Sequence, residues 1–244
     1  MSEVRSGQAR QSRSGGARRQ LILAAEQYFA LRGFIGASLK DIQEAAGQRN
    51  ASAVHYHFGS RDQLIEAILD YRIPPYADKR LARMEMLERK RGSLTMRDVV
   101  AAWIRPLAEE LRPRPDGNYY IRFLDQLRRN GPVEVRARAA NLQLIGYGAI
   151  FDLLMKQMPA ASQRLNRSRL ALTAELILSS LAQLEAALPA DEARPEDYPA
   201  LAVSNLVDYA AAGLAAEPDA ETVALERSST SGTDFHFSFH GPLT

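Results

Sequence analysis

Hydrophobic residues recur at helical spacing along most of the chain, and the pattern is most sharply punctuated between residues 38 and 69. In that stretch one apolar stripe begins after Ser38 and ends at Gly47, and another begins after Ser60. Each serine can act as an N-cap, because its hydroxyl can accept a hydrogen bond from a backbone N–H of the first turn. The pattern therefore predicts a helix of about two turns, a tight turn, a short second helix that Gly59 ends, and a third helix.

A helix, a turn of about four residues and a short helix with a polar outer face is the geometry of a helix-turn-helix, whose second helix enters the major groove of DNA. Val54 and Phe58 are expected on the inner side of that helix, while the small Ala53 on the outer side would allow a close approach to base edges. The residues predicted to contact DNA are Ser38, Arg49, Asn50, Ser52, Ala53, His55, Tyr56, His57 and Arg61. The same arrangement is also a generic packing motif, so a purely structural role is the alternative.

Three successive blocks, ILAAEQYFALRGF, SLKDIQEAAG and VHYHFGSRDQLIEAIL, resemble the DNA-binding domain of the TetR/AcrR family of repressors over about residues 18 to 69. Two side chains depart from the family pattern, with His55 where tyrosine is common and Arg61 where lysine is usual, and the stretch from Gln48 to Ala53 is one residue longer. The resemblance implies a ligand-responsive repressor that binds double-stranded DNA as a homodimer and has a mostly apolar effector pocket in its second half.

The segment before the helix-turn-helix divides into a basic arm and a helix. Residues 1–16 contain three arginines and one glutamate and are rich in Ser, Gly and Gln, so they are predicted to form a disordered basic arm. Such an arm could follow the phosphate backbone or a minor groove, or simply be a solvated tail. From Ala17 to Arg32 the apolar residues recur at helical spacing and stop at Gly33, which predicts the first helix of a DNA-binding domain over residues 17–73.

Helical spacing continues through the rest of the chain body, and no alternating strand pattern interrupts it. The fourth helix is expected to run from Arg61 to about Ile73 and to end there, because Pro74 and Pro75 follow. The remaining helices are predicted at about 76–91, 95–111, 119–129, 133–158, 163–188 and 198–215. The fold class is thus all-α, with an N-terminal three-helix helix-turn-helix DNA-binding domain and a C-terminal helical ligand-binding and dimerisation domain over residues 74–216.

The two helices at 163–188 and 198–215 are predicted to form a homodimer interface. The first is apolar on more than one face, so it must be covered on more than one side. The second offers small and apolar residues to match, and two copies of the pair would make an isologous four-helix interface. Burial inside the monomer is the alternative. A twofold dimer would present its two recognition helices to a palindromic operator.

Most aromatic residues between 99 and 158 fall at helical spacing and are candidates for an effector pocket. The expected pocket residues are Trp103, Leu107, Tyr119, Tyr120, Phe123, Tyr147, Phe151 and Met155. Such clusters are usually plain core, but Tyr and Trp have polar ends that need partners, and Gly146 and Gly148 remove side-chain volume nearby. The family resemblance implies a small, largely apolar effector, and the candidates for anchoring a polar group of it are Arg105, Arg122, Asn141 and Gln143.

Other features narrow the class of protein. The chain has no cysteine, its only histidines are His55, His57, His236 and His240, and it shows no glycine-rich phosphate loop, so no catalysis, metal or cofactor is expected. No apolar run is long enough to span a bilayer, which predicts a soluble, cytoplasmic protein. Residues 217–244 form an acidic tail that ends in alternating Phe and His and is expected to be flexible. The alternative function is a helical small-molecule-binding protein or enzyme in which the helix-turn-helix is only structural.

Overall fold

The computed structural model describes residues 2–48, 50, 52–89, 93–111, 117–144, 148–188 and 198–228. All secondary-structure elements in these ranges are helices, so the all-α prediction is confirmed. The elements are α1 (Ser2–Gly36), α2 (Leu39–Ala45), α3 (Ala53–Phe58), α4 (Arg61–Glu88), α5 (Met96–Ala108), the 3-10 helix η1 (Glu109–Leu111), α6 (Tyr120–Asn130), α7 (Val133–Leu144), α8 (Gly148–Gln157), α9 (Gln163–Ala187), α10 (Tyr198–Ala215) and α11 (Ala220–Ser228).

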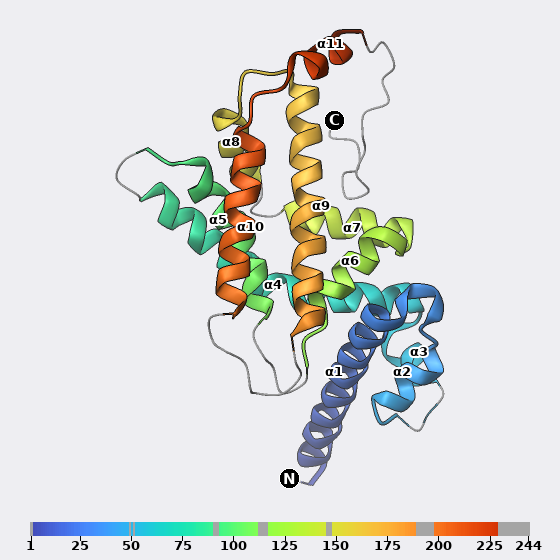
Figure 1. Ribbon diagram of the computed structural model, residues 1–244. Helices are drawn as coiled ribbons and strands as arrows, with labels where there is room; N and C mark the ends of the chain where they lie inside the picture. The colour runs from blue at the N-terminus through green and yellow to red at the C-terminus, as the bar shows by residue number, and fades with distance from the viewer. Residues whose placement is uncertain are drawn as a thin grey trace.

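Two parts of the molecule can be followed in Figure 1: α1, α2 and α3 project to one side, and α5 to α10 form a larger body. The small part and the start of α4 share a buried core that includes Phe29, Ile42 and Leu64. The larger body contains α9 and α10, which pack side by side and bury Leu181 and Val207. Helix α4 packs on α1 as well as on α5 and therefore connects the two parts.

Helix α1 is longer than the sequence predicts, because it begins at Ser2 rather than at Ala17. Residues 2–16, which the sequence predicts to be a disordered arm, are helical and extend α1 away from the rest of the molecule (Figure 1). The segment contains no proline and extends a helix that its buried part already nucleates, so the unfavourable nucleation step is avoided. At the other end the helix breaks at Gly33, whose φ of 67° is left-handed, and this is where the sequence predicts the stop.

Helix α4 continues through Pro74 and Pro75, so the predicted end near Ile73 is wrong. Prolines inside a helix remove backbone donors and crowd the preceding turn, at a cost of about 3 kcal/mol or more. Packing on both sides offsets this cost, because Ile73 is buried directly before the prolines and Met84 is buried further along. As a result, the predicted domain boundary after residue 73 lies inside one continuous helix.

Two further differences concern the C-terminal part. The single helix predicted over 133–158 is two helices, α7 and α8, and the sequence between them contains glycine, which has a low helix propensity. Helix α11 lies within the tail 217–244, for which the sequence predicts flexibility. The alternating Phe and His residues at 235–240 lie outside the described residues.

By length and composition, α9 is the one described helix that could cross a membrane. It is also a core helix, since Ile177 and Leu181 are buried and the buried Glu185 binds backbone N–H groups of α6. Core helices of soluble proteins pass the same test. One side of α9 is such a core, whereas Leu172 and Leu176 are exposed.

Candidate nucleic-acid interface

Two serine caps hold the helices of the helix-turn-helix in place. Ser38 Oγ and Ser60 Oγ each accept a hydrogen bond at 3.1 Å from the backbone N–H three residues later. These bonds begin α2 and α4, and both are the caps that the sequence predicts. The first helix of the motif and the helix that follows the motif therefore each begin at a local hydrogen bond.

The amino end of α3 is held by a side chain of α2. Ser52 is the N-cap residue but makes no side-chain cap bond. Asn50 Oδ1 accepts from the N–H of Ser52 at 2.9 Å and so shapes the turn. The cap comes from α2, where the buried Gln43 accepts from the N–H of Val54 at 3.2 Å. The sequence contains a sign of this cap, because Gln43 is a polar residue on the apolar stripe of α2, four positions after Leu39.

The outer face of α3 consists of Ser52, His55 and Tyr56, all exposed, and Tyr56 has 78% exposure. Ala53 is only 5% exposed, so its predicted place on the outer face is wrong. The reason is the phase of this short helix: one step of about 100° after Ala53 comes the buried Val54, so both point toward the core.

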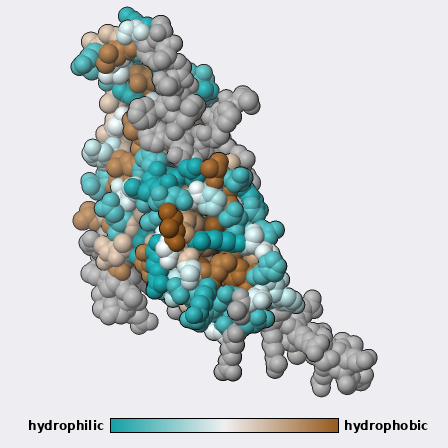
Figure 2. Space-filling view, turned by 90° about the vertical axis from the view of Figure 1, so that its right-hand side faces the viewer, coloured by the Kyte–Doolittle hydropathy of each residue, from teal (hydrophilic) through white to brown (hydrophobic). Residues whose placement is uncertain are grey.

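Aromatic and cationic side chains surround α3. The ring of the half-buried His57 meets that of Tyr56 edge-on, with the ring centroids 5.0 Å apart. The exposed Arg18 of α1 lies over the ring of Phe58 at 5.0 Å, which brings a cation beside α3. Arg18 is absent from the predicted contacts, because only the fold brings α1 next to α3. Seen from the side of α2, α3 and α7, the surface is mostly hydrophilic with separate hydrophobic patches (Figure 2).

Arg61 contacts α1, and the sequence does not predict this contact. It is half-buried, its guanidinium lies 5.2 Å from the centroid of the Phe29 ring, and it donates a hydrogen bond to the carbonyl of Phe34. It therefore ties α4 to α1. The side chain is only half-exposed, and its predicted contact with a phosphate stays a prediction. Of the remaining predicted contacts, Ser38 and Asn50 are exposed, and Arg49 lies outside the described residues.

Three of the predicted pocket residues gather where α6 meets α1. Tyr120 is buried and stacks on Phe123, with ring centroids 6.4 Å apart. Phe123 in turn lies 6.1 Å and 6.5 Å from the rings of Phe34 and Phe29. The hydroxyl of Tyr119 accepts a hydrogen bond from Gln27 Nε2 at 3.1 Å. These rings join the two parts of the molecule.

The other predicted pocket residues lie on α5 and α8. The rings of Trp103 and Phe151 meet edge-on, with their centroids 5.5 Å apart. Leu107, one turn after Trp103, is buried, and Met155, one turn after Phe151, is half-buried. Tyr147, Asn141 and Gln143 lie outside the residues whose side chains are described. Among the candidate polar anchors, Arg105 is exposed and Arg122 pairs with Glu185 at 3.1 Å.

A buried ion pair lies beside the contact between α1 and α6. Arg72 of α4 donates two hydrogen bonds of 2.6 Å to the carboxylate of Glu26 of α1, and its guanidinium lies 5.7 Å from the centroid of the Tyr120 ring. Burial raises the pKa of Tyr120 far above its usual value, and the nearby carboxylates of Glu26 and Glu110 act in the same direction. The hydroxyl of Tyr120 is therefore neutral at physiological pH.

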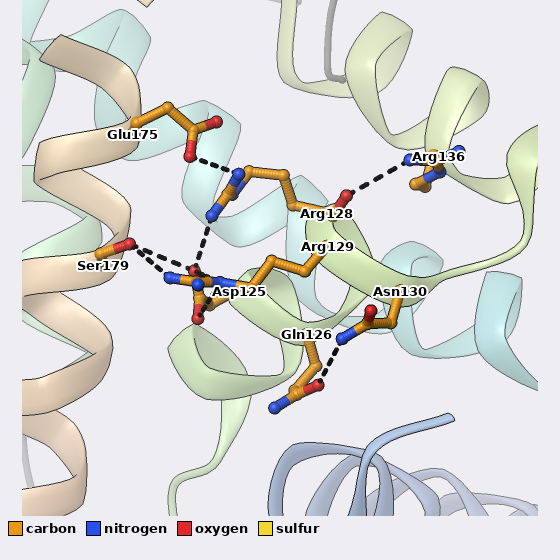
Figure 3. Close-up of polar contacts among 8 residues, drawn as sticks. All are labelled: Asp125, Gln126, Arg128, Arg129, Asn130, Arg136, Glu175 and Ser179. Atoms are coloured by element: carbon orange, nitrogen blue, oxygen red, sulfur yellow. Dashed lines mark hydrogen bonds and ion pairs between the residues drawn. The ribbon is translucent and has the colours of Figure 1, made fainter. Parts of the chain in front are cut away.

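Helix α6 is also fixed to α9 by polar contacts, which Figure 3 shows. Arg128 pairs with Glu175 of α9 and with Asp125 at 3.2 Å. Arg129 donates to Ser179 of α9 at 2.9 Å and to Asp125 at 3.1 Å. Polar contacts thus join α6 to the body, whereas aromatic contacts join it to α1.

One family of known proteins matches the helix-turn-helix part of the chain. Residues 21–68 match the model of a family described as "Bacterial regulatory proteins, tetR family". A transcriptional regulator from Rhodococcus sp. Rha1, of known crystal structure, aligns at 22% identity with a TM-score of 0.43, covering 82% of this chain and 99% of that one. No curated protein matches the chain. The family match spans α2, α3 and the adjoining parts of α1 and α4, which are the capped helix-turn-helix described above, so residues 21–68 form a DNA-binding domain of the TetR type.

Proposed function

We propose that the protein is a ligand-responsive repressor that binds a palindromic operator as a homodimer and is released by a small, largely apolar effector. The observation that carries the proposal is the outer face of α3, where Ser52, His55 and Tyr56 are exposed on a helix whose inner side is locked by Val54 and Phe58. A rigid short helix with hydroxyl, imidazole and phenol groups on one face can donate to base edges and phosphates.

Phosphate contacts are expected at the edges of this face. Arg18 beside α3 and the exposed Lys40 on α2 supply cations there, and the helical extension at residues 2–16 carries further arginines. Each phosphate that a cation neutralises releases condensed counterions, so the affinity should fall steeply with salt. A protein that acts on DNA in this way would work in the cytoplasm.

Exposed apolar side chains on α9 and α10 support dimerisation. Leu172 and Leu176 lie one turn apart on α9, and Leu201 and Tyr209 are exposed on α10. The two helices pack side by side, so a second copy could cover both and form an isologous four-helix interface. The twofold axis would then place two copies of α3 about 34 to 36 Å apart, or a multiple of that spacing, to match the half-sites of a palindrome.

The effector is expected between α5 and α8, where Trp103, Phe151 and Met155 offer an apolar lining. Release requires that the effector bind the DNA-incompetent conformation more tightly, typically by about 1–3 kcal/mol of coupling. Helix α4 is the lever in this scheme, because it runs without interruption from the helix-turn-helix to the body. A cross-link that locks α4 to α1 should abolish the ligand response, and release that survives the lock would contradict this route.

The decisive experiment is salt-dependent binding of the protein to the DNA that flanks its own gene, compared with an unrelated duplex of equal length. A specific complex at least about a thousandfold tighter, containing two protomers or a multiple, is the expected result. Tyr56→Ala should weaken that complex without lowering the melting temperature. The control is Met86→Ala, which truncates a 65% exposed side chain on α4 outside the helix-turn-helix and should leave binding unchanged.

Weak binding that does not discriminate between the duplexes would call for a genome-wide selection of bound fragments. If that selection also enriches no sequence, the repressor proposal fails, and a helical small-molecule-binding protein or an enzyme with a structural helix-turn-helix takes its place.

A further inference from the structure

The first turn of α6 is held by a side chain from another helix. Its N-cap residue, Tyr119, provides no side-chain hydrogen bond to the helix. Glu185 of α9 supplies the cap instead: one carboxylate oxygen accepts from the N–H of Ile121 at 3.0 Å, and the other accepts from the N–H of Arg122 at 2.9 Å. The second oxygen also accepts from Nε of Arg122 at 3.1 Å. Three donors of α6 therefore converge on one carboxylate of α9.

This contact should determine the position of α6 closely. The first N–H groups of a helix have no partner within the helix, and they carry the positive end of its dipole. Glu185 is only 5% exposed, so its charge depends on these donors in place of water. A shift of α6 along α9 would lengthen three charge-assisted hydrogen bonds at once, and such bonds weaken over a few tenths of an ångström.

The same turn of α6 contacts the DNA-binding part. The hydroxyl of Tyr119 accepts from Gln27 of α1, the ring of Tyr120 lies against Arg72 of α4, and Phe123 packs on aromatic rings of α1. Residues of one helical turn thus bind α9 through Glu185 on one side and α1 and α4 on the other. Any displacement of this turn relative to α9 must be passed to the helix-turn-helix or absorbed by the aromatic contacts.

We infer that Glu185 is a positioning residue for operator binding: it fixes the first turn of α6 to α9, and through that turn it sets where the helix-turn-helix stands relative to the proposed dimer helices. The inference rests on the proposed function, because the position of the helix-turn-helix matters only if two copies must fit one operator. Glu185 itself is buried at the end of α9 and touches no DNA. Its expected effect is on the position of the helix-turn-helix.

The test compares Glu185→Gln with Glu175→Gln. Both remove a carboxylate from α9 that pairs with an arginine of α6, but only Glu185 caps the first turn. Hydrogen–deuterium exchange should show the amides of Ile121 and Arg122 exchanging roughly ten- to a hundredfold faster in Glu185→Gln, as expected for losing a hydrogen bond to a charged acceptor. In Glu175→Gln these two amides should exchange as in the wild type.

The position of the helix-turn-helix relative to α9 is measured by resonance energy transfer between two labels on one chain. The protein has no cysteine, so Glu44→Cys on α2 and Arg167→Cys on α9 provide two unique labelling sites at exposed positions. Labelled chains are diluted into an excess of unlabelled protein, so that each labelled chain reports only its own geometry. Glu185→Gln should shift or broaden the distance distribution, and Glu175→Gln should leave it closer to that of the wild type.

Operator affinity is the last readout. Glu185→Gln should weaken binding by about tenfold, within the range of ordinary coupling energies, while sedimentation shows the same oligomeric state as the wild type. Glu185→Ala repeats the comparison if the glutamine variant keeps enough of the cap to mask the effect.

An unchanged distance distribution with faster amide exchange would overturn the inference, because the cap would then stabilise α6 without positioning the helix-turn-helix. Unchanged amide exchange in both Glu185→Gln and Glu185→Ala would overturn it as well. If the wild type binds no operator but the distance distribution still changes, the positioning contact stands and only the repressor proposal fails.

Discussion

Removing one member of the buried Glu26–Arg72 pair should destabilise the protein far more than removing an exposed pair of similar geometry. The two side chains are 2% and 4% exposed, and the two hydrogen bonds between them are both 2.6 Å long. Arg72→Met leaves the carboxylate of Glu26 buried without its counter-charge. The expected loss is about 3–5 kcal/mol, because an uncompensated charge in a protein interior is costly.

The control is Arg89→Met. Arg89 and Glu85 also form a hydrogen-bonded pair, at 3.0 Å, but their side chains are 78% and 62% exposed. Solvent and salt screen such a pair, so its loss should change stability by no more than about 0.5 kcal/mol. The comparison therefore separates the effect of burial from the effect of breaking an ion pair.

The assay is thermal unfolding followed by circular dichroism at one fixed protein concentration, since the proposed dimerisation would make stability depend on concentration. For a chain of this size, the loss at Arg72 corresponds to a fall in melting temperature of roughly 6–20 °C. The double variant Glu26→Leu with Arg72→Met removes both charges and should recover most of the loss, because an apolar replacement of a buried pair is often near neutral.

Two results would refute this reasoning. One is a fall in melting temperature for Arg72→Met that is no larger than for Arg89→Met. The other is a double variant whose loss equals the sum of the two single losses, which would mean that Glu26 and Arg72 stabilise the fold independently rather than through each other.

Three further predictions concern local features. Ser38→Ala removes the cap of α2 and should cost about 1 kcal/mol in urea unfolding, while leaving the cap at Ser60 in place. Gly59→Ala should cost about 1–3 kcal/mol in the same assay, because Gly59 has a φ of 80°; unchanged stability would show that the turn can relax. Burial alone would raise the pKa of Glu109, but hydrogen bonds from two cations of α4 hold it below its ordinary value of 4.5. The ionised form therefore stabilises the fold above pH 4.5 and this contribution is lost as the pH falls further, so an acid titration of Glu109→Gln should be flatter than that of the wild type.

The sequence predicts the parts of this fold that local chemistry determines. The caps at Ser38 and Ser60 and the break at Gly33 each depend on residues within one turn of them. All three are found where the pattern places them, because a hydroxyl or a glycine has the same effect in most contexts.

The sequence is a poor guide where a distant partner decides the outcome. Arg61 looks fully exposed until the fold brings the carbonyl of Phe34 to it. The two prolines at 74 and 75 look like a helix end, yet tertiary packing carries α4 through them. The prediction for Ala53 was wrong for a smaller reason: Ala53 lies only one step of about 100° from Val54, and the inner side of α3 buries both residues.

The aromatic residues of α6 are a further case in which distant partners decide the role of a side chain. Their contacts also determine how a movement of α6 would reach the helix-turn-helix. Rings at helical spacing can line a cavity or fill a contact between helices, and the partners of Phe123 lie about ninety residues earlier in α1. The rings of α1 and α6 are tilted against one another, and such van der Waals contacts tolerate small displacements better than charge-assisted hydrogen bonds such as those of Glu185. We therefore expect α6 to move together with α9, and any change in the position of the helix-turn-helix to occur as a sliding of α1 across the rings of α6.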